Sequence, residues 1–133
     1  MTIYVEVRFL KTSESSENYL ETILLLSRRL PVVRSVDIAN EMDFKKSSIS
    51  VAMKHLREKK LIIVDNSGFI FLTDEGREIA ERTYEKHEFV SNWLHSIGVP
   101  EDIAVEDACR IEHVLSPESF EALKKYVAAH PAD

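Results

Sequence analysis

Between residues 35 and 72 the sequence changes from helical to extended patterns, and this order constrains the fold more than any other feature. A short amphipathic segment is capped by Ser35 and breaks at Asp43–Lys46. A second helical segment starts at Lys46 or Ser47, and its apolar residues recur with the spacing i, i+3, i+4 and i+7. The residues that form this single buried face are Ile49, Ala52, Met53 and Leu56.

Two short apolar runs follow the second helical segment. Leu61–Val64 and Phe69–Leu72 are rich in β-prone residues and flank the turn sequence Asp65–Gly68, which predicts a β-hairpin. An amphipathic helix, capped by Ser15 or Ser16 and extending to about Arg29, precedes the whole region. Helix, short helix, tight turn, helix and hairpin is the order of a winged helix-turn-helix fold.

Three further helices are predicted in the rest of the chain, each with a recognisable start signal. They cover about 74–97, 101–115 and 117–129, behind Thr73, Pro100 and Ser116. Residues 3–9 instead alternate between apolar and polar, which predicts a short strand. The fold class is therefore mainly α, with a winged helix-turn-helix followed by an all-helical region.

The charge is distributed unevenly along the chain. Residues 1–76 hold 11 Lys and Arg against 11 Asp and Glu, whereas residues 77–133 hold 6 against 12. The predicted second helix and its flanks carry a local basic stripe that suits DNA phosphates even in a chain of net charge −6. The acidic second half suits a divalent cation or a partner surface, although both halves could simply be solvated.

The polar residues of the second helix suit double-stranded DNA. A recognition helix buries one face and presents short hydroxyls and flexible cations to the major groove. The candidate DNA-binding residues are Lys45, Lys46, Ser47, Ser48, Ser50 and Lys54. A winged helix used only for protein contacts is the alternative, in which the chain is a metal-free interaction module with a packing Cys/His cluster.

The stretch Cys109–His113 indicates a metal site. Positions i, i+3 and i+4 share a helix face at about 5–6 Å between Cβ atoms, so Cys109, Glu112 and His113 can converge on one cation. Thiolate and imidazole favour iron, cobalt, nickel or zinc, while carboxylate also suits manganese. The alternative is that the lone cysteine is a small packing residue.

Several classes of protein are disfavoured. The N-terminus lacks a signal-peptide pattern, and apolar runs such as Ile23–Leu26 are too short to span a membrane. One cysteine allows no internal disulfide. A cytoplasmic protein without a membrane partner is expected. No His-Glu-x-x-His pattern accompanies the metal candidates, so we do not expect an enzyme.

Four stretches resemble the diphtheria toxin repressor and manganese transport regulator family of metal-dependent repressors. They are Ser16–Leu24, Val36–Ala39 with Lys46–Ser50, Leu72–Gly76 and Asp107–Ser116. The resemblance runs from about Ser15 to the C-terminus and is to the short, two-domain members. It implies an extra N-terminal segment at 1–14, a winged helix-turn-helix DNA-binding domain at 15–76, and a helical metal-binding and dimerisation domain at 77–133, with metal bound between the two domains.

The resemblance also implies a ligand set and a function. The metal ligands would be Asn18, Glu21, His87, Cys109, Glu112 and His113. Cys109 follows the iron-type members and Glu21 the manganese-type members, whereas Asn18 follows neither. By this resemblance the chain represses metal homeostasis genes as a homodimer on operator DNA when loaded with Fe(II), the first choice, or Mn(II), the second. His87, beside apolar residues on a long helix, could alternatively be a packed core histidine, and Glu21 a surface carboxylate.

The amphipathic C-terminal helices are the candidate dimer interface, unless their apolar residues only fill the core of one chain. The residues concerned are Phe89, Val90, Trp93, Leu94, Phe120 and Leu123.

Overall fold

A computed structural model describes residues 13–131, which fall into two compact units. One unit spans Ser13–Arg82 and the other begins at Thr83. The strand predicted at residues 3–9 lies outside the described residues. Each unit is considered separately below.

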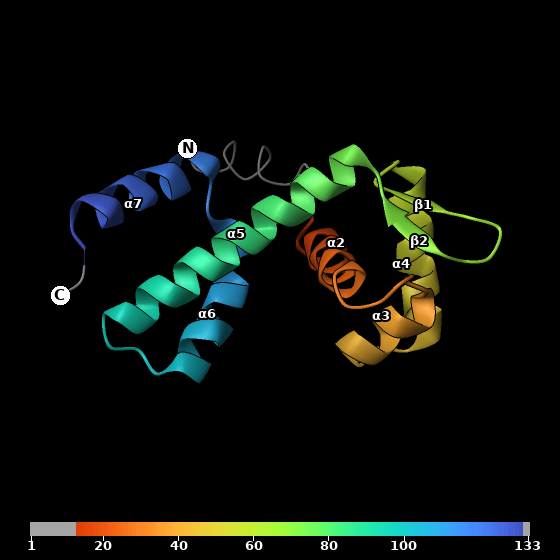
Figure 1. Ribbon diagram of the computed structural model, residues 1–133, viewed down its shortest axis with the longest axis horizontal. Coiled ribbons are helices and arrows are strands. Elements are labelled where there is room, and N and C mark those ends of the chain that lie inside the picture. The colour runs from red at the N-terminus through yellow and green to blue at the C-terminus, as the bar shows by residue number, and fades with distance from the viewer. Residues whose placement is uncertain (1–12, 132–133) are drawn as a thin grey trace. The chain divides into compact units, whose positions relative to one another are not determined.

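The N-terminal unit is a winged helix-turn-helix, as the sequence predicted. Three helices are followed by a two-stranded antiparallel hairpin and the start of a long helix, an order that can be followed in Figure 1. Helix α2 packs against α3, α4 and β2, while α4 also packs against β1. The elements are α2 (Glu14–Ser27), α3 (Ser35–Met42), α4 (Lys46–Glu58), β1 (Ile62–Val64), β2 (Ile70–Leu72) and α5 (Asp74–Ser96).

Two predicted helix caps in this unit were wrong. Helix α2 is capped by Ser13, whose Oγ accepts a hydrogen bond from the Ser16 amide at 3.1 Å, so Ser15 and Ser16 lie inside the first turn. Helix α3 begins at Ser35 itself, and the cap position is Arg34. The Asp37 carboxylate accepts a hydrogen bond from the Arg34 amide at 2.8 Å, so it holds the N-terminus of α3 without a serine cap.

The turn between α3 and α4 depends on Asp43. This residue adopts a left-handed conformation with φ of 57°, and its amide donates to the Ala39 carbonyl. Among residues with a side chain, Asp and Asn tolerate this conformation best. The tight turn fixes the direction in which α4 leaves α3.

The hairpin is joined closely to α5. Ile63 pairs with Phe71 across the two strands, and the Thr73 amide donates to the Leu61 carbonyl oxygen at 3.1 Å. Gly76 lies against the same carbonyl, and a Cβ there would overlap the Leu61 oxygen. Thr73 caps α5 as predicted, since its Oγ1 accepts from the Gly76 amide at 3.1 Å. The sequence Thr73–Gly76 therefore holds the β1–β2 hairpin, the wing of this fold, against the start of α5.

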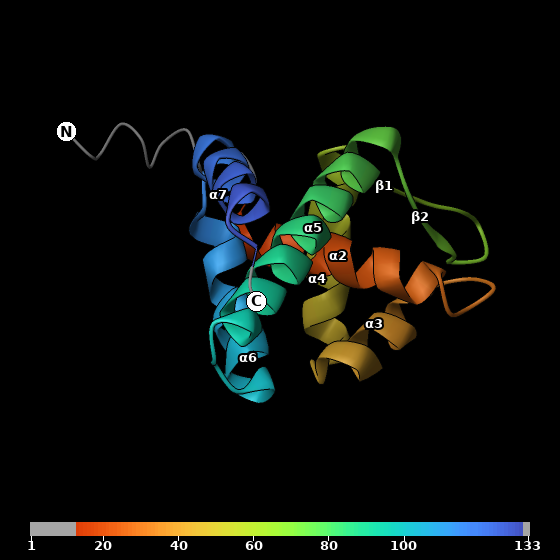
Figure 2. The same cartoon turned by 60° about the vertical axis from the view of Figure 1, so that its left-hand side comes forward.

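The C-terminal unit consists of the remainder of α5 with α6 (Glu101–Val114) and α7 (Pro117–Ala129), shown in Figure 2. Phe89 of α5 packs edge-to-face on Phe120 of α7, with 5.5 Å between ring centroids. Lys124 of α7 donates to Glu85 of α5 at 2.9 Å and to Glu121 at 3.1 Å. These two hydrogen bonds, that to Glu85 foremost, raise the pKa of Lys124 above its ordinary value. Ser116 caps α7 as predicted by accepting from the Ser119 amide.

The six dimer-interface candidates differ in exposure. Val90 and Phe120 are buried within the chain, so their apolar area already contributes to the core of a single copy. Phe89, Trp93, Leu94 and Leu123 are half-buried. None of the helices in the described residues is long and apolar enough to cross a membrane.

Candidate metal centre and nucleic-acid interface

Four of the six metal candidates lie on α5 and α6, where these two helices meet. Ala104, Ala108 and Glu112 recur every four residues on α6 and are all buried. Because alanine side chains are short, they allow close helix packing, and Glu112 continues the same buried row. A carboxylate therefore occupies the next position of an otherwise apolar face, with only 2% of the residue exposed.

Three of the predicted ligands converge within this unit. The donor atoms of His87, Cys109 and Glu112 all lie within 4.8 Å of one another. Cys109 Sγ is 3.8 Å from His87 Nδ1, and the same ring nitrogen is 3.7 Å from Glu112 Oε2. The sequence separation of 22 residues between His87 and Cys109 shows that the cluster joins two helices.

Glu112 has one oxygen that nothing in the described residues satisfies. Its Oε2 atom is buried and lacks a hydrogen-bond partner. A buried carboxylate oxygen without a partner is costly, and binding a cation is one way in which proteins compensate it. This oxygen, the thiol and the imidazole together form a donor set suited to a divalent transition metal. These three side chains therefore fit the divalent cation that the sequence analysis predicted.

His113 lies beside this cluster. Its side chain is 1% exposed, and its Nε2 atom is 3.8 Å from the second carboxylate oxygen of Glu112, Oε1. The three-residue cluster does not include it. The two imidazoles thus flank the two oxygens of one carboxylate.

The remaining ligand candidates belong to the other unit. Asn18 and Glu21 lie three residues apart on α2, and both are half-buried. The Asn18 carbonyl oxygen accepts a hydrogen bond from Thr22 Oγ1 at 2.8 Å. The implied ligand set is therefore divided between Ser13–Arg82 and the C-terminal unit.

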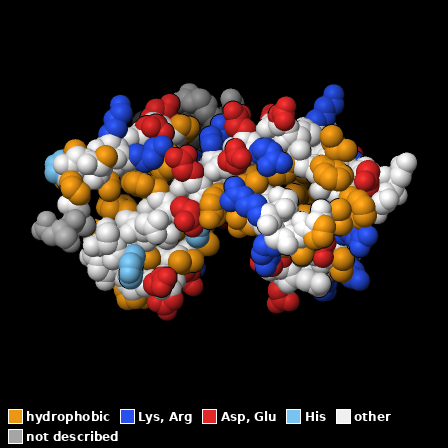
Figure 3. Space-filling model, in the orientation of Figure 1, with side chains coloured by type: hydrophobic (Ala, Val, Ile, Leu, Met, Phe, Trp, Pro, Cys, Tyr) orange, Lys and Arg blue, Asp and Glu red, His pale blue; other side chains and the backbone are white. Residues whose placement is uncertain are grey.

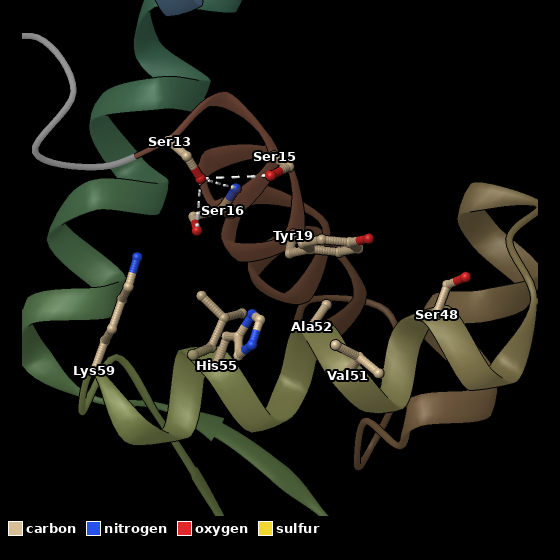
Figure 4. Close-up of a pocket in the computed structure, with 10 residues that line it drawn as sticks. Ser13, Ser15, Ser16, Tyr19, Ser48, Val51, Ala52, His55 and Lys59 are labelled. Carbon is tan, nitrogen blue, oxygen red and sulfur yellow. Dashed lines mark hydrogen bonds between the residues drawn. The ribbon is translucent and has the colours of Figure 1, made fainter.

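The DNA-binding candidates all lie on or immediately before α4, and all are exposed. Lys45 precedes the helix, and the remaining five occupy its first three turns: Lys46, Ser47, Ser48, Ser50 and Lys54. A cavity of about 280 Å³ lies between this helix and the start of α2. Figure 4 shows His55 of α4 and Lys59, which caps its end, below Ser16 of α2 and Ser13, which caps its start.

The wing differs from the helix in chemistry. Its turn at 65–68 contains no Lys or Arg, and Asp65 Oδ1 accepts hydrogen bonds from the amides of Ser67 and Phe69. Ile63 and Phe71 are exposed on one side of the hairpin, where Figure 3 shows apolar side chains gathered. The turn itself therefore offers phosphates no cation, whereas Arg34 lies over the Phe69 ring beside it, 4.7 Å from the ring centroid.

Comparison with known proteins identifies the family. Residues 11–68 match the domain described as "Iron dependent repressor, N-terminal DNA binding domain", and residues 73–132 match "Iron dependent repressor, metal binding and dimerisation domain". The transcriptional regulator MntR of Escherichia coli O6:H1 is 32% identical over 127 residues, covering 96% of this chain and 82% of that protein. The chain belongs to the DtxR/MntR family of metal-dependent transcriptional regulators.

Other members of the DtxR/MntR family agree with this assignment. The HTH-type transcriptional regulator MntR of Bacillus subtilis is 30% identical over 112 residues, covering 84% of this chain and 79% of that protein. The structure of the manganese regulator SloR superimposes with a TM-score of 0.75 at 28% identity, and that of T. acidophilum IdeR with a TM-score of 0.72 at 26% identity. The matches cover 85% and 84% of this chain, which spans only 53% of each of those two solved chains.

Sequence reasoning missed two features of this DtxR/MntR member. The partnerless oxygen of Glu112 was not anticipated, although the Ala104–Ala108–Glu112 spacing was a signal that the carboxylate shares a buried face. Val51 was also not considered as a contact residue: it lies outside the predicted apolar face of α4, and it is exposed among the polar residues of that helix.

Proposed function

We propose that this protein represses transcription by binding duplex operator DNA as a homodimer when His87, Cys109 and Glu112 hold a divalent cation. The observation that carries the proposal is the convergence of three donor atoms within 4.8 Å, one of them a buried carboxylate oxygen that lacks a hydrogen-bond partner among the described residues. His113, in contact with the other oxygen of Glu112, and Asn18 and Glu21 of α2 are the further proposed ligands.

Fe(II) is the proposed cation, with Mn(II) the second choice. A thiolate donor selects softer metals than oxygen donors do, and Cys109 supplies one here. The matched family is described as iron-dependent, while SloR is described as a manganese regulator, so both metals have precedent among relatives. The Cys109 sulfur is the atom that favours iron.

The cation is proposed to act as an allosteric ligand and not as a DNA contact. Its ligands include residues of α5 and α6, whereas the proposed DNA contacts are on α4 in the N-terminal unit. A ligand shifts a conformational equilibrium only through its different affinity for the two states, typically by about 5–150-fold. Linkage then requires operator DNA to tighten metal binding by the same factor.

The homodimer proposal rests on the few base pairs that one recognition helix can contact and on the matched dimerisation domain. One recognition helix contacts only a few base pairs, so a two-fold arrangement on a symmetric operator supplies the specificity that a single copy lacks. The half-buried residues Phe89, Trp93, Leu94 and Leu123 remain the proposed contact surface. Val90 and Phe120 would support that surface from within.

The decisive experiment measures, at fixed salt, how metal changes the affinity for duplex DNA and how duplex DNA changes the affinity for metal. Mn(II) or, without oxygen, Fe(II) is titrated by calorimetry into the protein alone and into its complex with a selected duplex. We expect duplex binding to strengthen with metal, and metal affinity to rise equally with duplex. Lys54→Ala should weaken duplex binding and leave the metal affinity of the free protein unchanged.

Equal metal affinities with and without duplex would overturn the regulatory proposal. If duplex affinity is the same with and without metal, and the protein binds no metal, the result would instead support the metal-free interaction module. A monomeric mass with metal and duplex present would overturn the homodimer.

A further inference from the structure

Four residues of α4 form a single outward row opposite its buried face. Ile49, Met53 and Leu56 are buried in the N-terminal unit. Four other residues follow one another at intervals of four, three and four, so they share one side of the helix, and this side is opposite the buried face. The members of this outward row, all exposed, are Ser47, Val51, Lys54 and Glu58.

Val51 is the apolar member of this row, and 56% of it is exposed. Figure 4 shows its side chain on α4 between Ser48 and Ala52. Exposed valines are common at surfaces and need no special explanation when they stand alone. The position of Val51, between a hydroxyl and a cation that suit DNA contacts, is what gives it a role.

We infer that Val51 reads the C5-methyl group of a thymine in the major groove, and this inference rests on the proposed DNA-binding function. If α4 enters the groove, the outward row faces the base edges. Valine has no donor or acceptor, so it cannot pair with a phosphate or with the polar edge of a base. The thymine methyl is the one apolar group that the major groove presents.

The same chemistry determines which bases Val51 rejects. A cytosine at this position has no C5-methyl group, so Val51 would lose its apolar contact and face a C5 hydrogen instead. Val51 therefore discriminates by burying one methyl group that the other bases do not offer.

The experiment begins by selecting preferred duplexes from a random library with the metal-loaded wild-type protein. Each thymine of the selected half-site is then replaced by deoxyuridine, which removes only the C5-methyl group. We expect one position per half-site to lose about fourfold in affinity, the value of one buried methyl group, and about 15-fold when both half-sites are changed. Replacing the whole pair by 5-methylcytosine and guanine keeps the methyl group, and this duplex should bind about fourfold more tightly than the same duplex with unmethylated cytosine.

Val51→Ala supplies the matching protein change. The variant should bind thymine and deoxyuridine duplexes with affinities within about twofold of each other, because the side chain that contacts the methyl group is gone. Val36→Ala is the control, since Val36 is also exposed, at 37%, but lies on α3. That variant should retain the full difference between the two duplexes.

The outcomes separate this inference from the function on which it rests. Specific duplex binding in which no single thymine methyl matters would overturn the inference and leave the regulatory function standing. Methyl sensitivity that persists in Val51→Ala would overturn it as well. A protein that binds no duplex with any metal would overturn both.

Discussion

Replacing Glu112 with glutamine tests whether the buried carboxylate is present for the cation or for stability. Glu112 Oε2 makes no hydrogen bond within the described residues, and the two imidazole nitrogens near the carboxylate lie at 3.7 and 3.8 Å, beyond hydrogen-bonding distance. In the presence of a chelator, Glu112→Gln should therefore be no less stable than the wild type, since it removes a buried charge without breaking a short contact.

The wild type and Glu112→Gln should differ in thermal stability once metal is added. A cation present at about 100 times its Kd stabilises the wild type by about 2.7 kcal/mol. For a chain of 133 residues, that free energy raises Tm by roughly 10 °C. Glu112→Gln should lose most of this rise, because the neutral amide is a much weaker ligand than the carboxylate.

The assay is thermal unfolding followed by circular dichroism, with a chelator or with excess Mn(II) or Co(II). Glu106→Gln is the matched control: it removes the same charge from an exposed position of α6 and should retain the full metal-dependent rise. A Glu112→Gln protein that is destabilised by several kcal/mol without metal, or that keeps the wild-type rise with it, would refute the reasoning.

Two further changes test other parts of the structure. Gly76→Ala should lower the free energy of unfolding by roughly 1–3 kcal/mol, since the new Cβ overlaps the Leu61 carbonyl oxygen; urea unfolding would measure it, and a loss no larger than that of the exposed Glu78→Ala would contradict the packing argument. Cys109→Glu should keep a metal site but move its preference from Co(II) or Fe(II) toward Mn(II). Competition titrations would reveal this shift, and an unchanged ranking would show that the sulfur does not control selectivity.

Elements with strong local signals were predictable from the sequence. The amphipathic spacing of α4 and the caps Thr73 and Ser116 require only neighbouring residues, and the structure confirms them, except that Ala52 of the predicted α4 face is only half-buried. The cap of α2 was misplaced because Ser13, Ser15 and Ser16 are chemically equivalent, and only the backbone conformation distinguishes them: Ser13 is extended, with φ of −71° and ψ of 158°.

Tertiary features were harder to predict. The need for glycine at position 76 arises from a carbonyl fifteen residues earlier, at Leu61, which no local pattern encodes. Likewise, the spacing in Cys109–His113 indicated which side chains share part of a helix, but the approach of His87 from α5 depends on how two helices pack. The resemblance to a family supplied that residue where spacing did not.

The order of the metal donors along the chain has a consequence for biosynthesis. Residues 13–82 form one compact unit whose packing partners all lie within that span, so this unit can assemble as it leaves the ribosome. His87 emerges next, and Cys109 and Glu112 follow after about 1–5 s at ordinary rates of translation. A nascent or prematurely terminated chain can thus present a folded recognition helix before it possesses any cluster to hold a cation, and such a fragment would escape control by metal.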